Sequence, residues 1–157
     1  NNYFDKIFTL ETLVHSPDLN KTLKEFRRIL KPKGRVVLFE YSRESPKEFT
    51  KWEGKMLNLI NEYSVMTSFS KMFHNELPKF IVKAGFKIIS DGDISSYMLP
   101  SLERFYVYAK VPYKIIKLFS LQKYFVNTTA GVEFFNFVKK RLVRYRIIVA
   151  EKTVARL

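Results

Sequence analysis

Apolar and polar positions follow two different periods in the first forty residues. Residues 4–10 form a short, apolar, β-prone run, which predicts a strand buried on both faces. Residues 36–39 form a second run of this kind. Between the two runs, apolar side chains recur at helical spacing and predict a helix with one inward-facing side, formed by Leu19, Leu23, Phe26 and Leu30.

Local signals mark both ends of this helix. Ser16-Pro17-Asp18 combines a capping side chain with a proline at the first turn, which is typical of a helix start. Residues 31–34, Lys-Pro-Lys-Gly, end the helix and turn the chain. The first forty residues therefore predict a β-α-β unit whose strands are parallel and joined by a right-handed crossover.

The pattern further along predicts two more helices and two more strands. One helix begins at Ser45-Pro46, and an ordinary amphipathic helix on the sheet explains its apolar side, formed by Phe49, Trp52, Met56, Leu59 or Ile60, and Tyr63. The other spans residues 75–84, with Asn75 as cap, Pro78 in the first turn and Gly85 at the C-terminal end. Residues 86–94 and 144–150 are predicted strands.

About fifty residues, 95–143, separate the last two strands and are rich in aromatic side chains. A long connection of this kind usually carries function. Within it, Pro112 is predicted to start a basic amphipathic helix. Its faces carry Lys110, Lys114 and Lys117 on one side and Val111, Ile115, Leu118 and Phe119 on the other. Such a helix lies at a membrane surface or closes over a hydrophobic substrate. A cap that only completes the core is the alternative.

The net charge of +13 is unevenly distributed along the chain. From Lys110 onward there are eleven Lys or Arg residues and two carboxylates, so nine of the thirteen net positive charges lie there. A concentrated positive field attracts nucleic acid or anionic lipid headgroups. The chain has no cysteine, which excludes disulfides and zinc-thiolate sites. No apolar run reaches the roughly 18 residues of a transmembrane helix.

Several common kinds of site have no signal in this sequence. There is no nucleophile elbow and no phosphate-binding P-loop. The two histidines, His15 and His74, lack the spacing of a helical metal-binding pair, so we expect no metal site.

The predicted β-α-β unit resembles a known family. The runs FDKIFTLETLVHSP and LKEFRRILKPKGRVVLFEY are similar to strands four and five of class I S-adenosylmethionine-dependent methyltransferases. The run Glu11-Thr12-x-x-His15-x-Pro17 resembles the sterol 24-C-methyltransferases. A second match is KMFH at residues 71–74, before a helix that ends in KAGF at 83–86. The resemblance covers about residues 3–94 and is much weaker beyond.

The resemblance implies an α/β fold, namely the C-terminal half of a Rossmann-like class I methyltransferase sheet. Its strand order is 4-5-7-6 with strand seven antiparallel, and it carries a helical, aromatic-rich insertion. Residues 1–157 then form a partial methyltransferase domain, with a core at 1–94 and 143–152 and a cap at 95–142. The family's glycine-rich turn and acidic ribose-binding residue have no counterpart here. We therefore expect the C-terminal half of a longer enzyme, inactive by itself.

The carboxyl ends of parallel strands are where α/β sheets bind ligands. The resemblance places S-adenosylmethionine beside the end of the first strand, at Thr9, Leu10, Glu11 and Thr12. We expect Glu11 to be catalytic, and His15 to orient it or accept a proton. The alternatives are a capping or surface role for Glu11 and a backbone-bonded loop position for His15.

Eight residues are assigned to the substrate side of the pocket. Glu40 and Tyr41 end the second strand, three residues come from the second family motif, and the others are aromatic residues of the segments expected over the site. The eight are Glu40, Tyr41, Trp52, Lys71, Phe73, His74, Tyr97 and Tyr106. A solvated Lys71 is the alternative for that position.

Two functional hypotheses from different classes follow. The first is an S-adenosylmethionine-dependent methyltransferase acting on a sterol or other hydrophobic small molecule, with C-, O- or N-methylation left open. The second is a non-catalytic basic module that binds anionic membrane or RNA through residues such as Lys139, Lys140 and Arg141. No RNA-reading motif is present, so a peripheral contact with anionic membrane is the better prediction for the positive charge. We expect an intracellular location, either cytoplasmic or peripheral on an internal membrane.

Overall fold

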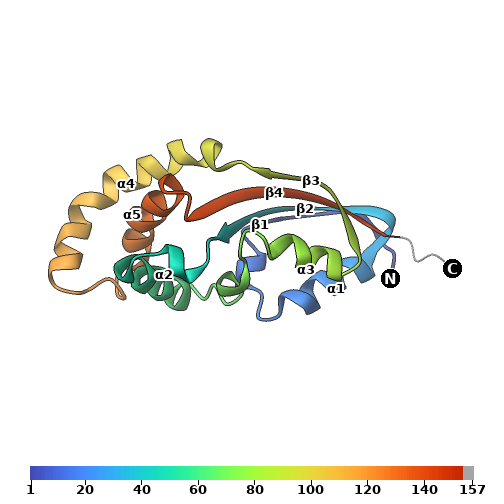
Figure 1. Ribbon diagram of the computed structural model, residues 1–157, viewed down its shortest axis with the longest axis horizontal. Coiled ribbons are helices and arrows are strands. Elements are labelled where there is room, and N and C mark those ends of the chain that lie inside the picture. The colour runs from blue at the N-terminus through green and yellow to red at the C-terminus, as the bar shows by residue number, and fades with distance from the viewer. Residues whose placement is uncertain (154–157) are drawn as a thin grey trace.

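The computed structural model describes residues 1–153, which form a four-stranded mixed sheet with helices on one face and at one end (Figure 1). The strand order is β1-β2-β4-β3. β1 is parallel to β2, while β4 is antiparallel to both of its neighbours. The strands are β1 (Phe4–Leu10), β2 (Leu30–Arg43), β3 (Phe86–Asp93) and β4 (Val143–Lys152). This confirms the predicted fold class and strand order.

The helices form two groups around this sheet (Figure 1). The first group, α1 (Leu19–Ile29) and α3 (Leu77–Lys83), lies beneath the strands. The second group, α2 (Lys51–Tyr63), α4 (Ser95–Leu118) and α5 (Val126–Lys139), gathers at the end of the sheet. Short 3₁₀ turns lie at Leu13–His15, Pro46–Glu48 and Phe69–Lys71. Among residues 1–153, no helix has the length and apolarity needed to cross a bilayer.

The two faces of the sheet differ in burial. Val36, Leu38 and Ile148 are fully buried on the face that the first helix group covers. On the opposite face, Phe8 and Leu10 are 71% and 57% exposed. The prediction that the first strand, β1, is buried on both faces is therefore wrong within residues 1–153. The reason is that β1 is an edge strand, paired only with β2, and no helix described here packs over its outer face.

Three predicted helix starts are displaced. Ser45-Pro46 leads into a 3₁₀ turn, and α2 begins only at Lys51, where Thr50 and Glu53 form a capping box. α3 begins at Leu77 without a side-chain cap from Asn75. α4 begins at Ser95, so Pro112 lies inside the helix instead of starting it. By contrast, the predicted role of Gly85 is confirmed, because its φ of +89° ends α3 in the left-handed conformation.

Candidate active site

The turn after β1 has an unusual backbone. Glu11 adopts a φ of +51°, a left-handed conformation that is rare for a residue with a Cβ. Its N–H donates to the carbonyl of Phe39 over 2.8 Å. The next backbone groups are fixed by the buried carboxylate of Glu40, whose Oε1 accepts from the N–H groups of Thr12 and Leu13, each at 2.9 Å. Strained backbone conformations of this kind cluster at functional sites.

The Glu40 side chain fixes this turn through hydrogen bonds. It lies outside the cavity that opens beside the turn. Its Oε1 also accepts from the hydroxyl of Thr9 over 3.2 Å, and its Oε2 is buried without a hydrogen-bond partner in the part of the chain that the structure describes. Burial raises the pKa of the Glu40 carboxyl, against the opposing effect of the donated N–H groups. The structure therefore places Glu40 outside the cavity lining, where its carboxylate accepts hydrogen bonds from the turn after β1.

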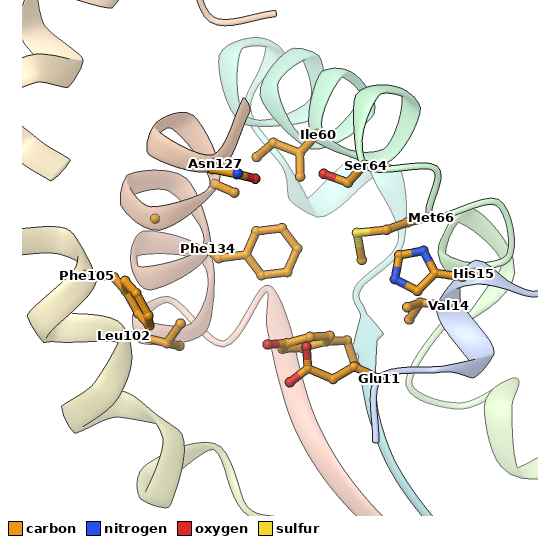
Figure 2. A pocket seen from close by; sticks show the side chains of 13 residues that line it. Glu11, Val14, His15, Ile60, Ser64, Met66, Leu102, Phe105, Asn127 and Phe134 are labelled. Carbon is orange, nitrogen blue, oxygen red and sulfur yellow. The ribbon is translucent and has the colours of Figure 1, made fainter. Parts of the chain in front are cut away.

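A cavity of about 320 Å³ opens where the end of β1 meets α2, α4 and α5 (Figure 2). Its walls are mostly apolar, and the few polar side chains converge from different elements. It is lined by Glu11, Val14, His15, Tyr41, Ile60, Ser64, Met66, Leu102, Phe105, Asn127, Ala130, Gly131 and Phe134. Three residues singled out in the sequence, Glu11, His15 and Tyr41, thus come together here. An apolar hollow with a small number of convergent polar groups is the usual form of a small-molecule site.

The negative charge of Glu11 acts on two buried tyrosines, Tyr41 and Tyr145. Burial, followed by the negative charge of Glu11 and a hydrogen bond to it, raises the pKa of Tyr41. The same causes raise the pKa of Tyr145 to about 12. Both hydroxyls therefore remain protonated at neutral pH. Tyr145 lies opposite Tyr41 in the β2–β4 register, with ring centroids 4.9 Å apart. The sequence analysis did not identify Tyr145. Only the pairing of its strand with β2 could have indicated that it lies next to Tyr41.

His15 is exposed, and one of its ring nitrogens is already occupied. Its Nδ1 lies 3.1 Å from the carbonyl oxygen of Val65. Because a carbonyl can only accept, the proton of the neutral ring sits on Nδ1 and Nε2 is left as an acceptor. The ring is thus hydrogen-bonded to the backbone, as in the alternative interpretation of His15 as a loop residue bonded to the backbone. It still lines the cavity, where its free Nε2 can accept a proton.

Three predicted aromatic contacts lie away from the cavity. Trp52 donates its Nε1–H to Glu133 over 3.3 Å, and the ammonium of Lys117 lies 4.5 Å from its ring centroid. Tyr106 stacks on Phe135 with centroids 4.7 Å apart. Tyr97 is exposed on α4. Trp52 and Tyr106 link α2 and α4 to α5. They therefore stabilise the packing of the helices that form the cavity wall.

The second family motif also lies outside the cavity. Lys71 is exposed, and Phe73 lies under the guanidinium of Arg43, whose Cζ is 5.7 Å from the ring centroid. His74 is buried, with Nδ1 2.7 Å from the hydroxyl of Ser42. Burial, and then the charge of Arg144, lowers the pKa of His74 to about 4, so the ring is neutral at physiological pH. The KMFH motif connects a loop to the end of β2. It does not line the cavity.

The four residues predicted to hold the cofactor divide into two pairs. Thr9 is buried and bonded to Glu40, and the hydroxyl of Thr12 donates to the carbonyl of Leu10 over 3.0 Å. Leu10 instead exposes its side chain on the uncovered face of the sheet, and Glu11 faces the cavity. An apolar side chain next to a carboxylate suits the methionine end of S-adenosylmethionine, whose sulfur carries a positive charge. The residues therefore fit this group along one side.

Comparisons with known proteins find methyltransferases among the similar proteins. The sequence profile of the methyltransferase domain matches residues 1–38. The chain is 34% identical over 130 residues to the S-adenosyl-L-methionine-dependent Diels-Alderase iccD of Talaromyces variabilis, which covers 81% of this chain and 44% of that protein. It is 26% identical over 100 residues to the sterol 24-C-methyltransferase of Pneumocystis carinii, which covers 63% of this chain and 26% of the relative.

A solved structure shares the fold. The cyclopropane synthase MmaA2 of Mycobacterium tuberculosis superimposes with a TM-score of 0.73 at 13% identity, covering 97% of this chain and 56% of that one. At this identity the likeness shows the fold alone. The chain spans less than half the length of the curated relatives that it matches.

Proposed function

We propose that this chain, which has part of the Rossmann-like fold of class I methyltransferases, supplies the acceptor pocket of an S-adenosylmethionine-dependent enzyme that acts on a hydrophobic small molecule. The observation that carries the proposal is the position of Glu11. Glu11 directly follows a parallel strand, and its carboxylate lines an apolar cavity beside Tyr41. The match to the methyltransferase domain favours an enzyme over a non-catalytic basic module.

Leu10 and Glu11 would hold the sulfonium end of the cofactor. When bound, S-adenosylmethionine supplies a methyl group on a positively charged sulfur. The apolar walls, among them Ile60, Leu102 and Phe134, bind the acceptor and exclude water from it. Holding two reactants in line is worth up to about 7–11 kcal/mol of the barrier.

Positive charge develops on the acceptor when a methyl group adds to an alkene carbon, and this chain has groups that stabilise it. The Glu11 carboxylate lies in the cavity wall beside Tyr41, where its negative charge stabilises a developing cation. The face of Phe134 stabilises a cation through its π electrons. The acceptor then loses a proton from the neighbouring carbon, and either Glu11 or the free Nε2 of His15 can take it. The similarity to a sterol 24-C-methyltransferase supports an isoprenoid acceptor.

The test uses the full polypeptide encoded by the gene. Titration calorimetry with S-adenosylmethionine should show one binding site, and methyl-labelled cofactor should pass its label to an apolar alkene acceptor. Glu11→Gln should lower turnover at least tenfold and change cofactor affinity little. The matched control is Glu62→Gln, the same substitution at an exposed position of α2. An absence of cofactor binding would refute the proposal, and unchanged turnover in Glu11→Gln would remove Glu11 from the mechanism.

A second candidate activity is ring closure without methyl transfer. It is favoured by the 34% identical relative, which is a Diels-Alderase by name. In such a reaction a diene and an alkene form two new carbon–carbon bonds, no proton or methyl group is transferred, and the product has the mass of the substrate. The same titration then detects cofactor binding, but the label stays on S-adenosylmethionine while a polyene acceptor is converted to a cyclic isomer. Mass spectrometry of the product separates the two activities.

A further inference from the structure

The long helix α4 has one buried side and one exposed apolar side. Toward α5 it buries Leu102, Ala109, Tyr113 and Ile116. On the opposite side five apolar or aromatic side chains follow one another at intervals of eleven, three, four and three residues, which places them along one surface of a helix. This outer ridge consists of Tyr97, Tyr108, Val111, Ile115 and Leu118, which are 58–81% exposed. Phe119 and Tyr124, also exposed, extend it at the tip of the α4–α5 hairpin.

Positive charge runs alongside the outer ridge. Lys110 and Lys114 are exposed on the flank of α4, and Lys123 is exposed at the tip. Nearer its start, α4 exposes one negative and one positive side chain, Glu103 and Arg104. No carboxylate lies on α4 after Glu103. Several large apolar side chains exposed along one helix face are uncommon on a soluble protein unless that face contacts something. An apolar stripe beside lysines complements a bilayer that contains anionic headgroups.

The outer ridge also leads to the candidate active site. Phe105 lines the cavity and is itself 66% exposed (Figure 2). It lies one helical turn before Tyr108, so the two side chains are neighbours on the helix surface. Phe105 therefore connects the outer ridge at Tyr108 with the rim of the cavity.

We propose that the outer ridge of α4 docks on the surface of anionic phospholipid bilayers. In this arrangement Ile115 and Leu118 enter the headgroup region, Lys110 and Lys114 contact lipid phosphates, and Phe105 faces the route by which a membrane-resident acceptor reaches the cavity. The docking surface itself is argued from α4 alone. Only the delivery of an acceptor rests on the proposed function.

The experiment is sedimentation of the full polypeptide with phosphatidylcholine vesicles, with and without phosphatidylserine. The wild-type protein should bind the mixed vesicles, and added salt should weaken binding. Ile115→Ser combined with Leu118→Ser should reduce binding at least tenfold. Lys110→Gln and Lys114→Gln should each reduce it about fivefold. The matched controls are Val82→Ser, an exposed apolar residue of α3, and Lys24→Gln, an exposed lysine of α1, which should bind as wild type.

Three results would overturn the docking proposal. The ridge variants could bind vesicles as well as the wild type does, the wild type could bind no better when phosphatidylserine is present, or ultracentrifugation without lipid could show a dimer that the Ile115/Leu118 variant abolishes. The last result would identify the ridge as a contact between copies of the chain. Cofactor titration is run without vesicles, so loss of cofactor binding with vesicle binding intact would refute the proposed function and leave this inference standing.

Discussion

His74 should make the stability of this protein depend on pH. Its ring is 6% exposed, its Nδ1 is paired with Ser42, and its Nε2 has no hydrogen-bond partner among the described residues. Burial and the positive charge of Arg144 lower its pKa from 6.5 to about 4, even though Glu44 lies 3.6 Å from Nε2. We therefore treat His74 as a neutral buried ring and not as half of an ion pair.

The direction of the pH effect follows from this pKa. Between pH 6.5 and about 4, the unfolded chain binds a proton at His74 that the folded chain does not. The contribution of the neutral His74 ring to the folding free energy is therefore fully present above pH 6.5 and is lost as the pH falls. The difference between the two pKa values corresponds to about 3 kcal/mol. Glu40 acts in the opposite direction, because its raised pKa lets the folded protein bind a proton first, which adds stability as the pH falls toward its ordinary 4.5.

A variant separates these two contributions. His74→Asn keeps a polar group near Ser42 and removes the titrating ring. It should lose a constant amount of stability at every pH, and between about pH 7 and about pH 4 its unfolding free energy should fall by about 3 kcal/mol less than that of the wild type. Urea unfolding of the full polypeptide, followed by far-UV circular dichroism at a series of pH values, measures both quantities.

The control is His15→Asn, which should keep the wild-type pH dependence because it leaves His74 in place. If His74→Asn shows the same pH dependence as the wild type, the ring is not held neutral by its surroundings. His74→Asn should also leave the Michaelis constant for the acceptor unchanged, since His74 does not line the cavity.

Three further substitutions test how the site is supported. Glu40→Ala should cost about 2–4 kcal/mol in urea unfolding because it leaves two backbone N–H groups without an acceptor, and Glu40→Gln should recover most of that loss. Tyr113→Phe removes the 2.5 Å hydrogen bond to the buried Glu133 and should cost about 1.5–3 kcal/mol, whereas Tyr108→Phe on the exposed side of α4 should cost nothing measurable. Thr50→Ala should lower the thermal midpoint through the loss of about 1 kcal/mol from the α2 cap, and an unchanged midpoint would contradict the capping box.

Much of the fold was accessible from local pattern. The first strand has the predicted bounds, and the strands at 86–93 and 143–152 lie within one or two residues of prediction. Apolar runs identify strands but do not say which strands pair, so the order with β4 between β2 and β3 came from the family resemblance. The start of α2 was misplaced because Ser45-Pro46 is itself a start signal, and only the reciprocal Thr50–Glu53 hydrogen bonds decide between the two positions.

The candidate site was predictable where it depends on strand ends. Glu11 and Tyr41 end neighbouring parallel strands, so sequence alone could bring them together. Tyr145 was missed because it comes from the antiparallel strand β4 and lies beside Tyr41 only through the register of β2 and β4. The KMFH motif was misplaced because a loop's position in the chain does not reveal on which side of a sheet it lies, and His74 ends up beneath the end of β2.

The open edge of β1 has a consequence for handling the protein. Its outer backbone N–H and C=O groups have no ladder partner among residues 1–153, and Phe8 and Leu10 stand beside them, exposed. Such an edge is a template for adding another strand. If residues 1–153 were expressed as a separate polypeptide, they would precipitate through strand-to-strand pairing at β1, and a charged residue such as Phe8→Lys would act as a gatekeeper that keeps the preparation dispersed.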